Sequence, residues 1–191
     1  MKRLLNLSLV TLFSILALTC ACAQRETYAI DPVHSSVTFK IRHFFSKVTG
    51  TFDEFQGTII VDRQNMISNE TQATLEINSI NTRNAKRDDH LKSPVFFDAA
   101  KYPQIMFKSK KWKKKDETQF EVMGDLSMHG VTKEVVLIVK STGFGEGMDK
   151  TYLSGWEAST TVKKSDFGIT YGGAALGDDV EISIEVEAHK Q

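Results

Sequence analysis

Apolar residues recur at every second position over most of this chain, and this period constrains the fold more than any other feature. Successive side chains of a β-strand point to opposite faces, so such a run has one apolar face and one polar face. The clearest run is the last one, in which Val180, Ile182, Ile184 and Val186 alternate with polar residues. The pattern predicts antiparallel strands that bury one face and expose the other to water.

Runs of the same kind occur from Tyr28 onward, and polar or glycine-rich turns at 62–65, 115–117, 143–147 and 172–173 separate them. About eight strands result, which predicts an all-β fold with a single antiparallel β-barrel. One run, 135–139, is apolar at every position, so we expect a lid segment or a partner subunit to cover its second face. The apolar positions of four further runs are Val37, Phe39 and Ile41; Ala73, Leu75 and Ile77; Phe120, Val122, Gly124, Leu126 and Met128; and Trp156, Ala158, Thr160 and Val162.

Residues 82–103 interrupt the strand pattern with a short charged helix. Asn84 is a good N-cap, and Pro94 ends the helix after Ser93. The helix has one large apolar residue, so it cannot form a core by itself, and we expect it to lie across one end of the barrel as a lid. The side chains expected to turn inward are Leu91, Phe96 and Phe97, and those expected to face water are Arg87, Asp88 and Asp89.

The first 23 residues have the features of a secretory signal peptide. Lys2 and Arg3 precede an apolar run at 4–18, and the run ends in small residues up to Ala23. The run is too short and too rich in polar residues for a good membrane span, although a retained anchor is the alternative. We therefore expect a signal peptide at 1–23, one domain at 24–191, and a periplasmic or secreted protein after cleavage near Ala23.

Both cysteines lie in this leader, so the exported domain has no thiol for a disulfide, a thiolate metal site or a nucleophile. A lipoprotein would be acylated on a cysteine just after the apolar run, typically with Leu three positions earlier. Thr19 stands at that position before Cys22, and Cys20 fits no better. A lipid-anchored form through Cys20 or Cys22 is therefore the less favoured alternative.

The charge balance argues against nucleic-acid binding. Removing Lys2 and Arg3 from the 24 basic residues leaves 22 against 24 acidic ones. A chain of this balance has no overall electrostatic attraction to nucleic acid. Its 168 residues suit one domain that buries most of its apolar surface.

Several short motifs, in order along nearly the whole chain after the leader, resemble the YceI family of exported bacterial proteins. The motifs are Asp31-Pro32-Val33-His34-Ser35, His43, Gly50-Thr51-Phe52, Phe55-Gln56-Gly57, Thr82, Arg87-Asp88-Asp89-His90-Leu91, Phe96-Phe97-Asp98, Lys101-Tyr102-Pro103, Phe107, the run from Gly124 to Lys133, Asp166-Phe167-Gly168 and Gly177-Asp178-Asp179-Val180. The chain departs from the family pattern at Tyr28, Glu134 and Lys164, which affects local packing and ligand preference rather than the fold.

This resemblance implies a lipocalin-like barrel that binds polyisoprenoid chains, quinone-like lipids or related amphiphiles in an elongated pocket. It also implies no settled catalytic activity, no cofactor besides the bound lipid, and a homodimer in many members. The residues alone leave core filling and cavity lining equally open for the inward aromatics, and the resemblance favours lining. The predicted ligand-binding residues are Phe39, Phe52, Leu75, His90, Leu91, Phe96, Phe97, Phe107, Phe120, Leu126 and Trp156.

Two other functions compete with that of a non-catalytic carrier. The first is a metal-dependent periplasmic hydrolase that uses His34, His90 or His129, although no histidine pair has the i, i+4 spacing of a zinc protease. His129 is expected to have a structural role in a turn, and His90 to contact the ligand. The second is a scaffold that contacts a membrane surface through the lysine-rich hairpin 108–115 around Trp112; a solvated hairpin end explains the same charges.

Overall fold

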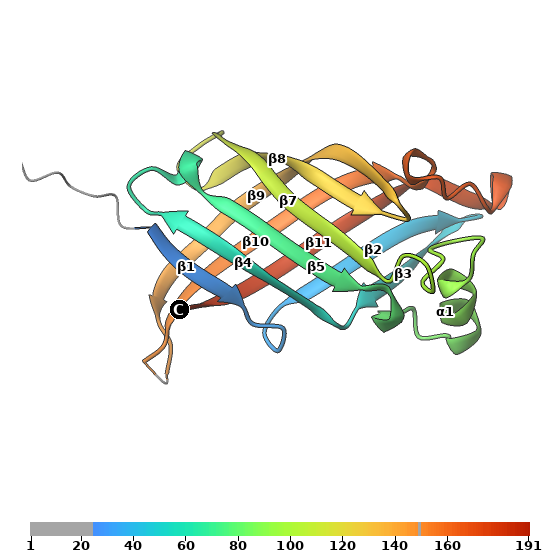
Figure 1. Cartoon of the computed structure of the whole chain (residues 1–191), viewed down its shortest axis with the longest axis horizontal. Helices are drawn as coiled ribbons and strands as arrows, with labels where there is room; N and C mark the ends of the chain where they lie inside the picture. Colours follow the sequence, from blue (N-terminus) through green and yellow to red (C-terminus); the bar gives the residue numbers. More distant parts are fainter. Residues whose placement is uncertain (1–24, 149) are drawn as a thin grey trace, which may run out of the picture.

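The computed structural model describes residues 25–148 and 150–191, which form a closed antiparallel barrel with one α-helix at one end (Figure 1). The strands are β1 (Arg25–Ile30), β2 (Ser36–His43), β3 (Ser46–Phe52), β4 (Phe55–Asp62), β5 (Glu70–Glu76), β6 (Ile80–Asn81), β7 (Gln104–Lys114), β8 (Gln119–Met128), β9 (Val131–Glu146), β10 (Tyr152–Lys163) and β11 (Leu176–Lys190). The helix is α1 (Ala85–Lys92), and short 3-10 turns lie at Met66–Ser68, Ile77–Ser79, Lys164–Phe167 and Gly173–Ala175. None of the helices among these residues is both long and apolar enough to span a bilayer.

Eight strands form the closed ring in the order β1-β4-β5-β7-β8-β9-β10-β11, and pairing of β1 with β11 completes it. The C-terminal end of β11 pairs with β1, for example His189 with Ala29, while its earlier part pairs with β2, for example Ile182 with Phe39. β2, β3 and β6 continue the sheet beyond β11 toward α1. The prediction of a single antiparallel barrel of about eight strands with a helical segment is confirmed.

The segment 82–103 folds as predicted around its capping residues. The Asn84 side chain accepts a hydrogen bond from the backbone N–H of Arg87 at 3.1 Å, and the helix ends at Lys92 just before Pro94. The chain then turns back, because the backbone N–H of Phe97 donates to the carbonyl of Leu91 at 3.0 Å. The segment is a compact unit at the end of the barrel beside β3 (Figure 1). We call residues 82–103 the lid segment.

Arg87 and Asp89 are exposed as predicted, but Asp88 is only partly exposed, and both Arg87 and Asp88 also bind Thr82. Thr82 is buried, and its backbone N–H and hydroxyl both donate to Asp88 Oδ1, at 2.9 and 2.5 Å. Arg87 Nε donates to the Thr82 hydroxyl at 2.7 Å, and another guanidinium nitrogen donates to the Thr82 carbonyl at 2.8 Å. Buried polar groups need partners, so these two charged side chains fasten the helix to the start of the lid segment.

Two predictions about β9 also differ from the structure. The glycine-rich stretch 143–147 is no turn: β9 continues to Glu146, pairs with β10 across a bulge, and the hairpin turn follows it. The run 135–139 does not lie beneath the lid segment, because Val136 and Ile138 on its outer face are 44% and 37% exposed. Coverage of this face by a partner subunit stays a prediction.

Candidate ligand-binding cavity

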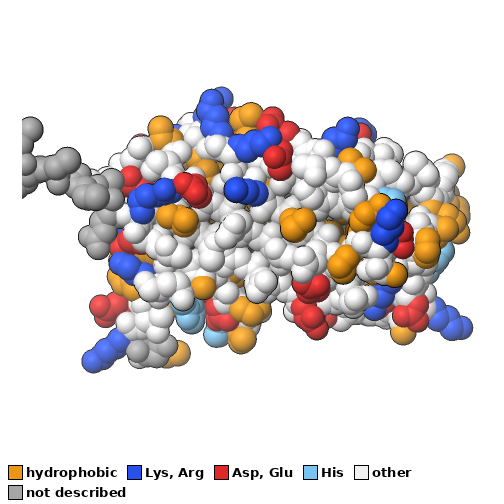
Figure 2. Space-filling model, in the orientation of Figure 1, with side chains coloured by type: hydrophobic (Ala, Val, Ile, Leu, Met, Phe, Trp, Pro, Cys, Tyr) orange, Lys and Arg blue, Asp and Glu red, His pale blue; other side chains and the backbone are white. Residues whose placement is uncertain are grey.

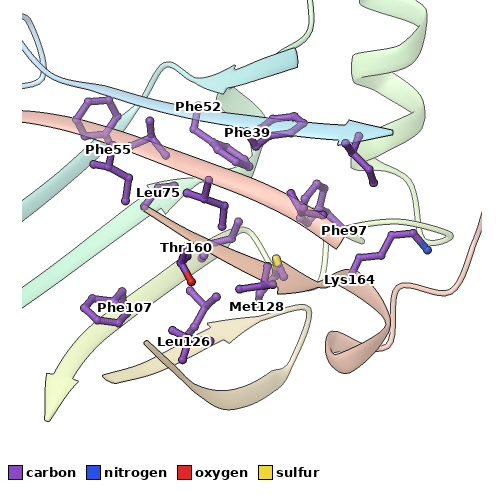
Figure 3. A pocket seen from close by; sticks show the side chains of 18 of the residues that line it. Phe39, Phe52, Phe55, Leu75, Phe97, Phe107, Leu126, Met128, Thr160 and Lys164 are labelled. Atoms are coloured by element: carbon purple, nitrogen blue, oxygen red, sulfur yellow. The ribbon is translucent and has the colours of Figure 1, made fainter. Parts of the chain in front are cut away.

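The barrel encloses a cavity of about 780 Å³. Side chains from the strands, the lid segment and the β10–β11 connection line it, and most of them are aliphatic or aromatic (Figure 3). Binding sites for small molecules usually have volumes of about 300 to 1,000 Å³. The cavity is therefore large enough for a sizeable apolar ligand.

Accessible surface on inward side chains shows that the interior is hollow. Val180, Ile182 and Ile184 line the cavity, yet each is only partly buried. In a solid core, such β-branched side chains would be close-packed by their neighbours. Their remaining surface faces the cavity. The barrel is therefore hollow and is not filled by its own side chains.

Ten of the eleven predicted ligand-binding residues lie along this cavity: Phe39, Phe52, Leu75, His90, Leu91, Phe96, Phe97, Phe107, Leu126 and Trp156. Phe120 is the exception, and it is 1% exposed. Its ring packs edge-on against Trp112 with 5.6 Å between the centroids, and Trp112 rather than Phe120 is a lining residue.

The cavity opens at the α1 end of the barrel. The exposed side chains among its lining residues are His43, Arg87, His90 and Tyr171, on β2, α1 and the β10–β11 connection. The rings of His90 and Phe96 lie 5.2 and 5.0 Å from the Tyr171 ring. These contacts join the lid segment to the opposite rim, so movement of the lid segment would widen the opening.

Lys164 is a cavity residue that the strand pattern did not predict. It begins the 3-10 turn after β10, is 8% exposed, and lies near Phe97 and Met128 at the α1 end (Figure 3). Its Nζ donates to the carbonyl of Ile169 at 3.1 Å. An ammonium group has three donors, so Lys164 is suited to bind an acceptor on a ligand that reaches this end.

Trp112 is a second missed lining residue, and a β-bulge explains why. Phe107 and Trp112 both line the cavity although they are five positions apart. The register of β7 against β8 shifts between Ser109 and Lys111, so the inward positions change from odd to even numbers. The alternation of Trp112 with Lys111 and Lys113 is the local signal for an inward tryptophan.

The three histidines proposed for a hydrolase lie in separate places. His90 is on α1, while His129 is in the β8–β9 turn, where its Nδ1 lies 2.9 Å from the Phe167 carbonyl. His34 lies in the β1–β2 loop, where its hydrogen bond to Asp31 raises the pKa of the imidazole and lowers the pKa of the carboxyl. The structure therefore does not assemble a metal centre from these three side chains.

The lysine-rich hairpin is less basic than its sequence indicates. Lys110 lies 2.5 Å from a carboxylate oxygen of Asp125, and Lys113 lies 3.4 Å from one of Glu121. Trp112 is turned into the barrel, and the hairpin is at the end away from α1 (Figure 1). A membrane bound there would be far from the opening. Carboxylates also lie among the basic groups on the face seen in Figure 2.

The comparison with known proteins identifies the family. Residues 28–188 match the family model described as the YceI-like domain. The chain belongs to the YceI family. Protein YceI of Salmonella agona is 36% identical over 182 residues, which cover 94% of this chain and 95% of that protein.

Solved structures of YceI proteins have the same fold. The Campylobacter jejuni YceI protein is 34% identical, with a TM-score of 0.72 over 77% of this chain and 87% of that chain. A polyisoprenoid-binding domain from Saccharophagus degradans, implicated in plant cell wall breakdown, has a TM-score of 0.69 over 86% of this chain and 98% of its own. It is 15% identical, so this likeness supports the fold alone.

Proposed function

We propose that this YceI-family protein is an exported, non-catalytic carrier that holds a long apolar ligand inside its barrel. The single observation that carries the proposal is the hollow, apolar interior with its opening at the α1 end. The apolar lining suits a long hydrocarbon chain, and we take an isoprenoid or quinone-like lipid as the ligand class from the resemblance to the YceI family. We further propose that residues 1–23 direct export to the periplasm or beyond and are then removed.

The energetics favour long ligands over short ones. A chain that hides ~400 Å² of apolar surface gains about 10 kcal/mol at ~25 cal/mol per Å². Association costs on the order of 4 to 15 kcal/mol. Because the gain grows with chain length while much of the cost does not, a short chain is held weakly and a long one tightly.

The lid segment is proposed as the gate for this ligand. Leu91, Phe96 and Phe97 supply the apolar inner surface of the lid segment, while the contacts of Thr82 with Arg87 and Asp88 keep its base in place. Opening therefore needs loss of the ring contacts at Tyr171 rather than unfolding of the barrel.

Lys164 is proposed to bind the polar head of the ligand. It is the one lysine along the cavity in the described part of the chain, and it lies at the open end. A ligand that enters tail first would leave its head beside this ammonium group. Hydrogen bonds to charged groups contribute about 1.5 to 3 kcal/mol, so Lys164 would favour a carboxylate or another anionic head.

A titration with two prenyl compounds of equal chain length, one an alcohol and one a carboxylic acid, tests this function. Both displace an apolar fluorescent probe from the wild-type protein, and a short-chain pair displaces it poorly. The substitution Lys164→Met weakens binding of the acid at least about tenfold, equal to about 1.4 kcal/mol, and leaves the alcohol unchanged. Failure of both long compounds to bind contradicts the carrier; equal effects on acid and alcohol contradict only the role of Lys164.

Contact with a membrane and dimerisation are further parts of the proposal. Phe44 and Phe45 are exposed in the β2–β3 turn directly after His43, one of the residues at the opening. Apolar side chains at that position suit transient contact with a lipid surface from which the ligand is loaded. The exposed Val136 and Ile138 on β9 are the position at which a homodimer would cover apolar surface.

A further inference from the structure

Two histidines and two carboxylates meet on the outside of the barrel, where β1 and β11 close it. Asp31 and His34 lie in the loop between β1 and β2, while Glu187 and His189 lie two residues apart on β11, which pairs with β1. Because side chains alternate along a strand, Glu187 and His189 share the outer face, and Ala188 between them is fully buried. We call these four side chains the His–carboxylate cluster.

Within the cluster the same two carboxylate oxygens face both imidazole rings. His34 Nδ1 lies 2.6 Å from Asp31 Oδ2 and 3.7 Å from Glu187 Oε1. His189 Nε2 lies 3.5 Å from Asp31 Oδ2 and 3.6 Å from Glu187 Oε1. In a tetrahedral zinc site with bonds of about 2.0 to 2.1 Å, neighbouring ligand atoms are about 3.3 to 3.4 Å apart. Three of the four histidine–carboxylate separations are close to this value, whereas His34 and Asp31 are hydrogen-bonded at 2.6 Å and would have to move apart to share an ion.

Hydrogen bonds outside the cluster hold its members in position. The backbone N–H of Asp31 donates to the Glu187 carbonyl at 2.9 Å, and the Ser35 hydroxyl bonds to both the N–H and the carbonyl of Glu187, at 3.0 and 3.1 Å. Asp31 Oδ1 accepts from the backbone N–H of Val33 at 2.9 Å, which orients the carboxylate with Oδ2 toward the rings. Such outer hydrogen bonds orient ligands in metal sites.

We propose that Asp31, His34, Glu187 and His189 form a surface site for a divalent transition-metal ion of the zinc type. Asp31, Glu187 and His189 are a group whose ligand atoms all lie within 4.8 Å of one another. His34 is outside this group, but its exposed ring faces the same two carboxylates and would supply the second imidazole after a small rotation. Imidazole nitrogens combined with carboxylate oxygens suit Zn²⁺ and its neighbours in the transition series. The two carboxylates also balance the charge of a divalent ion.

This site is separate from the ligand cavity, because none of the four residues lines it. It joins the loop at 31–34 to a strand more than 150 positions later in the chain, at the pairing that closes the barrel. A metal ion that binds the folded protein but not the unfolded chain stabilises the folded state. The site would therefore lock the closure of the barrel in the presence of metal, whatever ligand the cavity holds.

Isothermal titration of metal-free protein without an affinity tag, with Zn²⁺ as the probe, tests the proposal. The wild-type protein is expected to bind one ion per chain, and addition of Zn²⁺ is expected to raise its unfolding temperature. His189→Gln and His34→Gln are each expected to weaken binding at least about tenfold, as loss of support in such sites typically costs about 10- to 100-fold. Glu185→Gln is the matched control, since Glu185 is an exposed carboxylate two positions before Glu187 on the same strand.

Circular dichroism checks that each variant remains folded, and visible absorption of bound Co²⁺ reports tetrahedral coordination independently of affinity. The proposal is overturned if the double variant His34→Gln, His189→Gln binds Zn²⁺ as tightly as the wild type. It is also overturned if Glu185→Gln weakens binding equally. Absence of Zn²⁺ binding by the wild type also overturns the proposal, since the cluster is then only a hydrogen-bonded network of charged side chains.

Discussion

Replacing Phe97 with aspartate is expected to remove the bound lipid while the barrel stays folded. Phe97 lines the cavity from the lid segment, and its ring lies edge-on to Phe52 with 6.1 Å between the centroids. A carboxylate at this position needs water, and desolvating a charge is costly. The lid segment would then admit water to the opening. Retention of lipid through purification, measured by mass spectrometry of an organic extract, falls at least about tenfold, equal to about 1.4 kcal/mol.

Val95→Asp is the matched control for this variant. Val95 lies two positions earlier on the same lid segment but is 48% exposed and is not a lining residue. The same charge introduced there leaves lipid retention unchanged. Circular dichroism and thermal unfolding establish that both variants keep the barrel, because neither residue belongs to a strand. Lipid content of Phe97→Asp equal to that of the wild type would show that the lid segment does not gate the cavity.

Replacing Trp156 with alanine is expected to destabilise the barrel strongly. Trp156 is 3% exposed and packs edge-on against Trp112 and Phe144, with 5.8 and 5.6 Å between the centroids. Its indole N–H donates to the Ser154 hydroxyl at 3.1 Å. Truncating a buried aromatic side chain to alanine typically costs about 3 to 5 kcal/mol. Urea unfolding of delipidated protein measures this loss as a lower midpoint with an unchanged slope.

Tyr171→Ala is the comparison for that measurement. Tyr171 is also an aromatic residue along the cavity, but it is 49% exposed at the opening. Its removal is expected to lower the free energy of unfolding by less than about 1 kcal/mol, since most surface substitutions have small effects. Equal losses in the two variants would contradict the assignment of Trp156 to the packed interior and of Tyr171 to the exposed opening.

The sequence predicted those features that depend on local pattern. Alternation along 180–186 placed Val180, Ile182 and Ile184 on the inner wall, because the side-chain period of a strand does not depend on its partners. Asn84 and Pro94 set the limits of α1 through capping and through the missing N–H of proline.

Features that depend on strand pairing were not predictable in this way. The bulge near Ser109 changes the inward positions of β7 from odd to even numbers, so Trp112 lines the cavity. Lys164 lies in a turn, where no period indicates direction. The His–carboxylate cluster joins residues 31–34 to 187–189, and only the closing pair of strands brings them together. Residues 1–24 lie outside the described part of the chain. The signal peptide, its cleavage near Ala23 and the less favoured lipid anchor on Cys20 or Cys22 therefore stay predictions.

Mass spectrometry of an organic extract from protein purified out of its native envelope tests whether the barrel carries a lipid. We expect one dominant long apolar compound, at about one molecule per chain, that is released when the protein is denatured. Protein that yields no such compound, and that after delipidation takes up no long-chain prenyl alcohol or acid, would contradict a barrel whose hollow interior holds lipid.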